Sequence, residues 1–164
     1  TLELGNRVAG FYEKLGKMAG NPFMRFASKL FMKDALGVYY REYYEVVEEG
    51  LRLWRETGRD LLFHGAPAVI LIGSKPSATC PIEDALLASQ NILLAAHSMG
   101  LGTCLVGFVV EAMKHEPAVG KMLGIGPSET VRSVIAVGYP DERYCRAAER
   151  KPVKPRIFTG SSNG

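Results

Sequence analysis

The sequence has 164 residues, of which 47% are hydrophobic and 23% charged, so it is long and apolar enough for one globular domain and is not disordered throughout. Its formal net charge of +3 is unevenly placed: residues 1–140 hold 14 basic and 14 acidic residues, whereas residues 141–156 hold six basic and three acidic ones. Because a nucleic-acid interface needs many spread cations, this distribution disfavours nucleic-acid binding. It stays compatible with one phosphate group near the basic segment.

The cysteines indicate a reducing compartment. There are three, Cys80, Cys104 and Cys145, so they cannot all pair, and their spacing matches neither a CxxC motif nor a zinc site. A cytoplasmic location is the simplest interpretation. No run of about 18 apolar residues is present, so no transmembrane helix is expected, and the charged first residues lack the apolar stretch of a signal peptide.

Residues 1–60 have a mostly helical pattern. Apolar and aromatic residues recur every three or four positions over Tyr39–Thr57, which predicts one amphipathic helix that Gly58 can end. Gly20-Asn21-Pro22 breaks an earlier helical stretch. For residues 23–32 the pattern fits a helix and an irregular segment equally well.

Three strands are predicted in the rest of the chain. Residues 68–73 form a short, continuous apolar run typical of a buried strand. A second strand is expected over 103–110, with Gly107 in its interior, and a third over 131–137. Helices are expected over 81–99 and 114–123, and residues 153–158 are a candidate extended segment. Strands with helices between them predict a layered α/β or α+β fold.

The helix predicted over 81–99 is apolar on nearly every face. Pro81 suits its first turn, and Gly100 lies just past its end. A helix of this kind is expected to be buried on most sides, either at the centre of the protein or in a subunit interface. Gln90 and Asn91 lie inside it, and we expect them to be buried amides in a structural network rather than ligand contacts.

A glycine turn follows this helix and leads into the second predicted strand. Gly100 and Gly102 let the chain reverse, and Gly107 leaves space above the backbone. A flat ring could lie there against residues 105–107. The alternative, which composition alone favours, is an ordinary helix end followed by an ordinary strand. Cys104, expected to be buried on that strand, fits a small hydrophobic residue better than a nucleophile.

Other candidates for catalysis are weak. His64, His97 and His115 have no Cys or Asp partner at metal-ligand spacing, and we expect them to be structural or exposed. No GxSxG element supports a serine hydrolase. The adjacent acids Glu83 and Asp84 point in different directions on a helix and make a poor acid/base pair.

Several short segments, taken in order, resemble the FMN-dependent nitroreductase family. The resemblance covers about residues 60–156, and residues 1–60 resemble the family's variable helical region only in outline. No segment is specific by itself, but their order and spacing together are. The segments are residues 61–67 (LLFHGAP), Asp84-Ala85, residues 90–96 (QNILLAA), residues 100–104 (GLGTC), Gly107, residues 123–127 (LGIGP), residues 138–140 (GYP) and residues 150–152 (RKP).

This resemblance implies an α+β fold in which helices wrap a central antiparallel-type sheet as a three-layer sandwich. It also implies a homodimer with FMN at the subunit interface. The main-chain amides of a four-residue stretch would face the flavin near N5, and a basic pair near the C-terminus would bind its phosphate. The stretch consists of Cys104, Leu105, Val106 and Gly107, and the basic pair is Arg150 and Lys151. The resemblance assigns no catalytic acid or base and no metal, because the cofactor carries the hydride chemistry.

The implied function is an FMN-dependent oxidoreductase that passes hydride from NAD(P)H through flavin to a nitro compound, a quinone or a similar small-molecule acceptor. The missing GxGxxG motif agrees with a nicotinamide that stacks on flavin only transiently. One alternative is a non-catalytic flavin-binding or degenerate module of the same fold. Another is reductive dehalogenation, or a ferredoxin-linked reduction with the iron–sulfur domain outside this chain.

The resemblance also has a gap at the front of the chain. The family's Arg-Ser-x-Arg segment, which holds the FMN phosphate and ribityl chain, and its Pro-Ser-x-x-Asn segment are both absent before residue 60. We therefore expect residues 1–164 to form a single domain that lacks its front part, with about half of the usual phosphate contacts.

Overall fold

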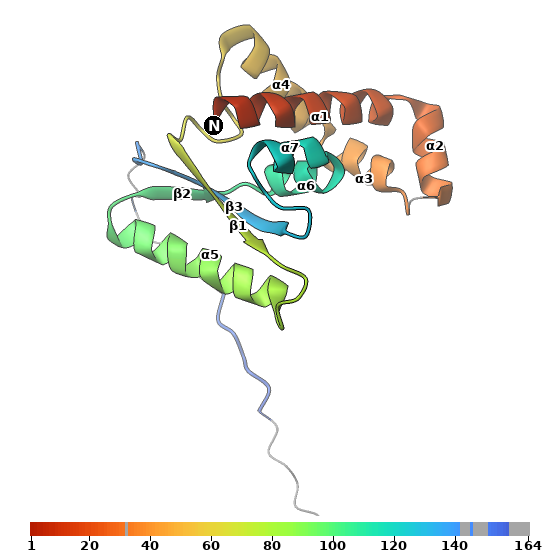
Figure 1. Cartoon of the computed structure of the whole chain (residues 1–164). Helices are drawn as coiled ribbons and strands as arrows, with labels where there is room; N and C mark the ends of the chain where they lie inside the picture. Colours follow the sequence, from red (N-terminus) through yellow and green to blue (C-terminus); the bar gives the residue numbers. More distant parts are fainter. Residues whose placement is uncertain (32, 142–144, 146–150, 158–164) are drawn as a thin grey trace, which may run out of the picture.

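The computed structural model of the chain describes residues 1–31, 33–141, 145 and 151–157. Four helices come first, and three strands and three further helices follow, with α6 and α7 in succession before the last strand (Figure 1). The elements are α1 (Leu2–Gly20), α2 (Pro22–Phe31), α3 (Ala35–Glu42), α4 (Tyr44–Thr57), β1 (Ala68–Ser74), α5 (Pro81–Ser98), β2 (Gly102–Leu105), α6 (Gly107–His115), α7 (Pro117–Met122) and β3 (Thr130–Gly138).

The three strands form one antiparallel sheet with the order β1-β3-β2. β3 is central, and both of its faces are covered: Val134 and Ile135 point to opposite sides and are 1% and 0% exposed. α5 packs against all three strands on one face of the sheet, and α6 packs on β3 with α1 beyond it (Figure 1). The expected α+β fold, with helices on both faces of an antiparallel sheet, is confirmed.

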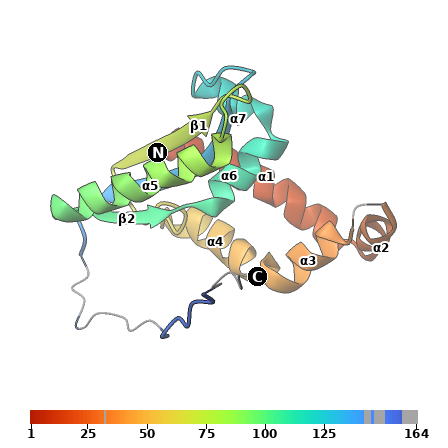
Figure 2. The same ribbon diagram turned by 90° about the horizontal axis from the view of Figure 1, so that it is seen from below.

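The main core lies between the sheet and the N-terminal helices. α1 contributes Leu4, Val8 and Tyr12, and β3 contributes Val131, Val134 and Ala136. α2 stands apart at the end of α1 farthest from the sheet (Figures 1 and 2), and its Phe23 and Phe31 are largely exposed. The sheet and its two helical layers therefore carry most of the packing.

The helical pattern of residues 1–60 is confirmed, with one correction. The helix expected over Tyr39–Thr57 is two helices, α3 and α4, which meet at Tyr43. At Tyr43 the backbone leaves helical geometry, with a φ of −127°; Tyr39 of α3 stacks on Tyr12, and Tyr43 packs edge-on against Phe108. Gly58 ends α4 at a φ of +70°, as expected.

The predicted ends of α5 are also confirmed. Pro81 opens the helix, and Gly100 follows it at a φ of +72°. The main-chain N–H groups of Gly100 and Leu101 donate to His97 and Ala96, which satisfies carbonyls of the last turn. Strands 68–73 and 131–137 are confirmed as β1 and β3, whereas residues 151–157 contain no strand.

Within the part of the chain that the structure describes, no helix is long and apolar enough to cross a membrane. In the same residues, no group of three or more His, Cys, Asp and Glu side chains is arranged to hold a metal ion.

Gly50 inside α4 and Gly58 just past its end are expected to respond in opposite ways to alanine. A methyl group at Gly50 would meet nothing within 4 Å, so Gly50→Ala should raise the free energy of unfolding by about 1 kcal/mol through helix propensity. Gly58→Ala should lower it by about 1–2 kcal/mol, because alanine is strained at positive φ. Urea unfolding followed by circular dichroism measures both, and equal effects would contradict the prediction.

Candidate functional site

The four residues expected beside the flavin lie where β2 ends and α6 begins. Cys104 and Leu105 are the last residues of β2, Val106 connects the two elements, and Gly107 is the first residue of α6. The strand expected over 103–110 is therefore wrong beyond Leu105. Phe108, Val109 and Ala112 pack into the core from one side of a helix, and this packing overrides the β-propensity of their sequence.

Val106 fixes this junction to the sheet. Its side chain is 5% exposed, and its main-chain N–H donates to the carbonyl oxygen of Val134 on β3 at 2.8 Å. That amide is therefore not available to a ligand, which corrects the expectation that all four amides face the flavin. The buried Val106 side chain holds this segment in the core, and the residues on either side of it form the open surface.

Leu105 and Gly107 form that open surface. Leu105 is 57% exposed, and a side chain built on Gly107 would meet nothing within 4 Å. The first turn of α6 has no side-chain cap, so its leading N–H groups have no partner from a capping residue. An apolar wall beside uncapped main-chain donors suits a flat ring with polar atoms on its edge.

Cys104 is exposed rather than buried. The reason is its place in the sheet: in the described residues β2 pairs with β3 alone, so it is an edge strand. The strand that carries Cys104 therefore lies at the rim of the sheet and not in its interior.

The other glycines of this region serve the packing of the chain itself. Gly102 and Gly138 face each other across β2 and β3. A Cβ on Gly102 would come within 3.3 Å of Pro140, and one on Gly138 within 3.0 Å of Pro67. The space beside Gly102 and Gly138 is therefore occupied by the protein itself, whereas the space beside Gly107 is open. The first two glycines serve packing, and Gly107 is the one with room for a ligand.

α5 differs from the expectation that it is buried on most sides. Only Ala85, Ser89 and Ala96 are buried, and they let the helix approach the sheet closely. Gln90 and Asn91 are exposed, so a buried amide network is wrong for this single chain. The outer side also carries acidic and polar residues, but its large exposed side chains are apolar: Ile82, Leu86, Leu87 and Leu94 of α5, and Met99 just after it, are between 49% and 73% exposed.

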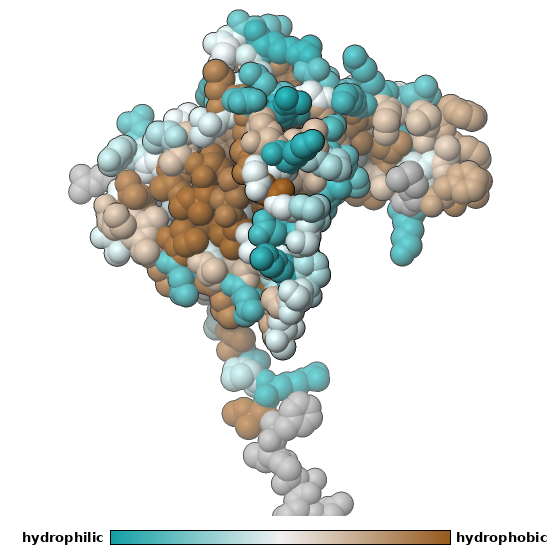
Figure 3. All heavy atoms as spheres, in the orientation of Figure 1, coloured by the Kyte–Doolittle hydropathy of each residue, from teal (hydrophilic) through white to brown (hydrophobic). Residues whose placement is uncertain are grey.

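The exposed apolar surface continues beyond α5. Figure 3 shows a large hydrophobic area on the side of the molecule where β1, β2 and α5 meet. Ile70 of β1 and Leu105 of β2 are 38% and 57% exposed. Figure 2 shows α5 lying in front of the strands, so its free face points away from the rest of the chain. Patches of this extent on a small protein mark interaction surfaces.

The predicted phosphate pair is only partly described. Lys151 is exposed, and Arg150 lies outside the described residues. The grouping of these two cations with the β2–α6 junction therefore stays a prediction.

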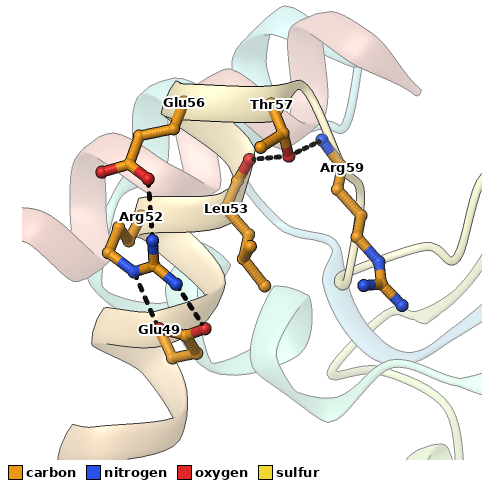
Figure 4. Close-up of polar contacts among 6 residues, drawn as sticks. All are labelled: Glu49, Arg52, Leu53, Glu56, Thr57 and Arg59. Carbon is orange, nitrogen blue, oxygen red and sulfur yellow. Dashed lines mark hydrogen bonds and ion pairs between the residues drawn. The ribbon is translucent and has the colours of Figure 1, made fainter.

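A hollow of about 450 Å³ lies between α1 and α4. The two arginines of its lining pair with carboxylates: Arg55 contacts Glu13, and Arg52 bridges Glu49 and Glu56 along α4 (Figure 4). The hydrogen bond from Arg52 holds the pKa of Glu49 below its usual value. Because both arginines are already paired, they are poor ligands for a further anion.

A model of the nitroreductase family matches residues 24–139 of this sequence. The chain belongs to the nitroreductase family. Over 61 residues it is 41% identical to a protein of Methanothermobacter thermautotrophicus and 36% identical to one of Archaeoglobus fulgidus, both named "Putative NADH dehydrogenase/NAD(P)H nitroreductase". Each match covers 37% of this chain, and 31% and 34% of the relatives, so the matched region spans about a third of their length.

Solved nitroreductase structures share the fold. A Bacteroides fragilis nitroreductase with bound FMN superposes with a TM-score of 0.51 at 17% identity, over 94% of this chain and 70% of that one. For a Desulfitobacterium hafniense nitroreductase with bound FMN the TM-score is 0.54 at 22% identity, over 71% and 62% of the two chains. An iodotyrosine deiodinase bound to FMN and 3-iodo-L-tyrosine gives 0.50 at 24% identity, over 88% and 72%.

Alanine at two glycines of this nitroreductase-family site should distinguish packing from open space. Gly138→Ala should lower the free energy of unfolding by about 1–3 kcal/mol, because its methyl group would collide with Pro67. Gly107→Ala should change it by less than about 0.5 kcal/mol, because the position is open. Urea unfolding of both variants checks this, and a loss of stability at Gly107 would show that the position is packed.

Proposed function

We propose that this chain is the flavin-binding part of an FMN-dependent oxidoreductase that passes hydride from NAD(P)H to a nitro compound, a quinone or a similar small acceptor. The observation that carries the proposal is the open junction of β2 and α6, where Leu105 is exposed and Gly107 leaves free space. The residues that resemble the family's flavin strand are those that form this surface. The names of the curated relatives and the FMN in the related structures support the same chemistry.

The junction fits FMN in shape and polarity. Leu105 would contact one face of the ring, and the absence of a side chain at Gly107 would let the ring approach the main chain. The uncapped N–H groups at the start of α6 would donate to acceptor atoms on the ring edge. Bound there, FMN supplies a ring that accepts and releases hydride, while the protein binds and orients it.

The phosphate of FMN would be held by Arg150 and Lys151. Lys151 is exposed and so accessible to an anion, and arginine binds phosphate through two parallel hydrogen bonds. The basic excess of residues 141–156 supports this assignment. We place the enzyme in the cytoplasm, where Cys80 and Cys104, which are exposed and form no disulfide, would stay reduced.

A second copy of the chain would cover the outer face of α5. Leu87 and Leu94 are 65% and 58% exposed on a helix whose inner side is already packed on the sheet. Burying such side chains contributes about 1.5–3 kcal/mol each, which favours association. Because Leu105 is exposed on the neighbouring edge strand, a homodimer formed through this side would place a subunit interface beside the flavin surface.

Visible absorption and fluorescence test flavin binding. The purified chain should bind FMN and quench its fluorescence. Gly107→Leu should weaken binding at least ten-fold, because its side chain would occupy the space proposed for the ring, and should change the free energy of unfolding by less than about 0.5 kcal/mol. A chain that stays colourless after incubation with FMN would refute binding. Bound FMN without NAD(P)H oxidation would favour the non-catalytic alternative.

Light scattering after size-exclusion chromatography tests the dimer. Leu87→Glu should shift the chain toward monomer, because a buried, unpaired carboxylate is costly at an interface. Val46→Glu is the matched control, because Val46 is 69% exposed on α4, beyond the other face of the sheet, and this variant should stay dimeric. If Leu87→Glu and the unchanged chain have the same mass at the same concentration, α5 does not form the interface.

A further inference from the structure

One hydrogen bond joins the first helix of the chain to the β2–α6 junction. The hydroxyl of Tyr12 on α1 donates to the carbonyl oxygen of Phe108 at 2.9 Å, across 96 residues of sequence. Phe108 is the second residue of α6 and follows Gly107 directly. A side chain far outside the resemblance segments therefore contacts the backbone of the proposed flavin surface.

The Tyr12 ring is held in place by other aromatic rings. It packs edge-on against Phe108, with 5.5 Å between ring centroids, and stacks on Tyr39 at 6.3 Å. Phe11, its neighbour in α1, stacks on His115 at the other end of α6 at 6.0 Å. α1 thus contacts both ends of α6, but the Tyr12 bond is the polar contact at the end that carries Gly107.

The hydroxyl of Tyr12 stays a donor over the working pH range. Burial, the nearby Glu111 carboxylate and Tyr39 raise its pKa above the ordinary tyrosine value. The bond to the Phe108 carbonyl therefore does not depend on pH near neutrality.

Val106 holds the start of α6 on the sheet, but the side of this turn that faces α1 and α4 borders a cavity. An apolar cavity of about 130 Å³ lies between α1, α4 and the start of α6, and both Tyr12 and Phe108 line it. The first turn of α6 also has no side-chain cap that would hold it from the other direction. Val106 restrains this helix start from the side of the sheet, and the Tyr12 hydroxyl restrains it from the side of α1.

We propose that Tyr12 is a positioning residue for the cofactor site: through the Phe108 carbonyl it fixes the first turn of α6, so that Gly107 and the leading N–H groups face the flavin. The role in cofactor binding rests on the function proposed above. The restraint on α6 is a property of this chain with or without cofactor. Loss of the hydroxyl is expected to loosen the turn and weaken FMN binding while the fold remains.

Tyr39 offers a matched control in the same aromatic cluster. It is 9% exposed, and its hydroxyl is buried without a hydrogen-bond partner. Burial raises its pKa to about 12, so this hydroxyl is also neutral. Tyr12→Phe and Tyr39→Phe each remove one buried oxygen from stacked rings, but only the first removes a bond to the junction.

The experiment compares both variants with the unchanged 164-residue chain. Amide exchange followed by NMR, without FMN, reports the turn directly through the N–H groups of Glu111 and Ala112, whose helical acceptors are the carbonyls of Gly107 and Phe108. Tyr12→Phe should speed exchange at these amides about five-fold relative to the N–H groups of Lys114 and His115 at the end of α6. Tyr39→Phe should leave that ratio within two-fold.

Fluorescence titration with FMN provides the second measurement. Tyr12→Phe should raise the dissociation constant about five-fold and Tyr39→Phe less than two-fold, and urea midpoints show whether either variant has lost general stability. If Tyr12→Phe and Tyr39→Phe behave alike in exchange and in titration, the proposal is overturned. If the unchanged chain binds no FMN, the proposed function and the cofactor role of Tyr12 both fail, while exchange still decides whether Tyr12 fixes the turn.

Discussion

The arrangement of this protein depends on β3, the strand that is buried on both faces. β1 and β2 pair with its two sides, α5 covers one face, and α6 covers the other. The hydrogen bond from Val106 to Val134 also ties the residue after β2 to β3, so it fixes the chain at the point where it leaves the sheet. The position of Gly107, and with it the proposed cofactor surface, therefore follows from the register of β3.

The local elements were largely predictable, because their signals lie in neighbouring residues. A continuous apolar run marked β1, and Pro81 and Gly100 marked the ends of α5. The break at Tyr43 and the early end of β2 were not predictable, because both depend on contacts with distant residues. Tyr43 packs on Phe108, and Phe108, Val109 and Ala112 pack into the core from one side of a helix, and neither set of contacts can be read from the local periodicity.

The same reasoning applies to the candidate site. The segment 104–107 could be found from its glycines and its resemblance to the nitroreductase family. The different roles of these four residues could not be found in this way, because they depend on which side chain is buried and on which main-chain N–H is already hydrogen-bonded within the protein. Tyr12 has no sequence signal at all: nothing in residues 1–20 points to residue 108. The grouping of Arg150 and Lys151 with this surface stays a prediction, as does the division of the chain into domains.

The exposed apolar face of α5 and the edge position of β2 are two aspects of one arrangement. A helix with apolar residues on nearly every face can bury only one side on a sheet of three strands, and the buried side of α5 consists of the small residues Ala85, Ser89 and Ala96. The large residues are left outside, next to an edge strand whose polar main chain also has a free side in the described structure. Among the described residues, a single copy covers neither surface. The second copy proposed above would cover the outer face of α5, and the proposed cofactor would lie at the edge strand, with an apolar face against Leu105 and hydrogen-bonding atoms toward the main chain beside it.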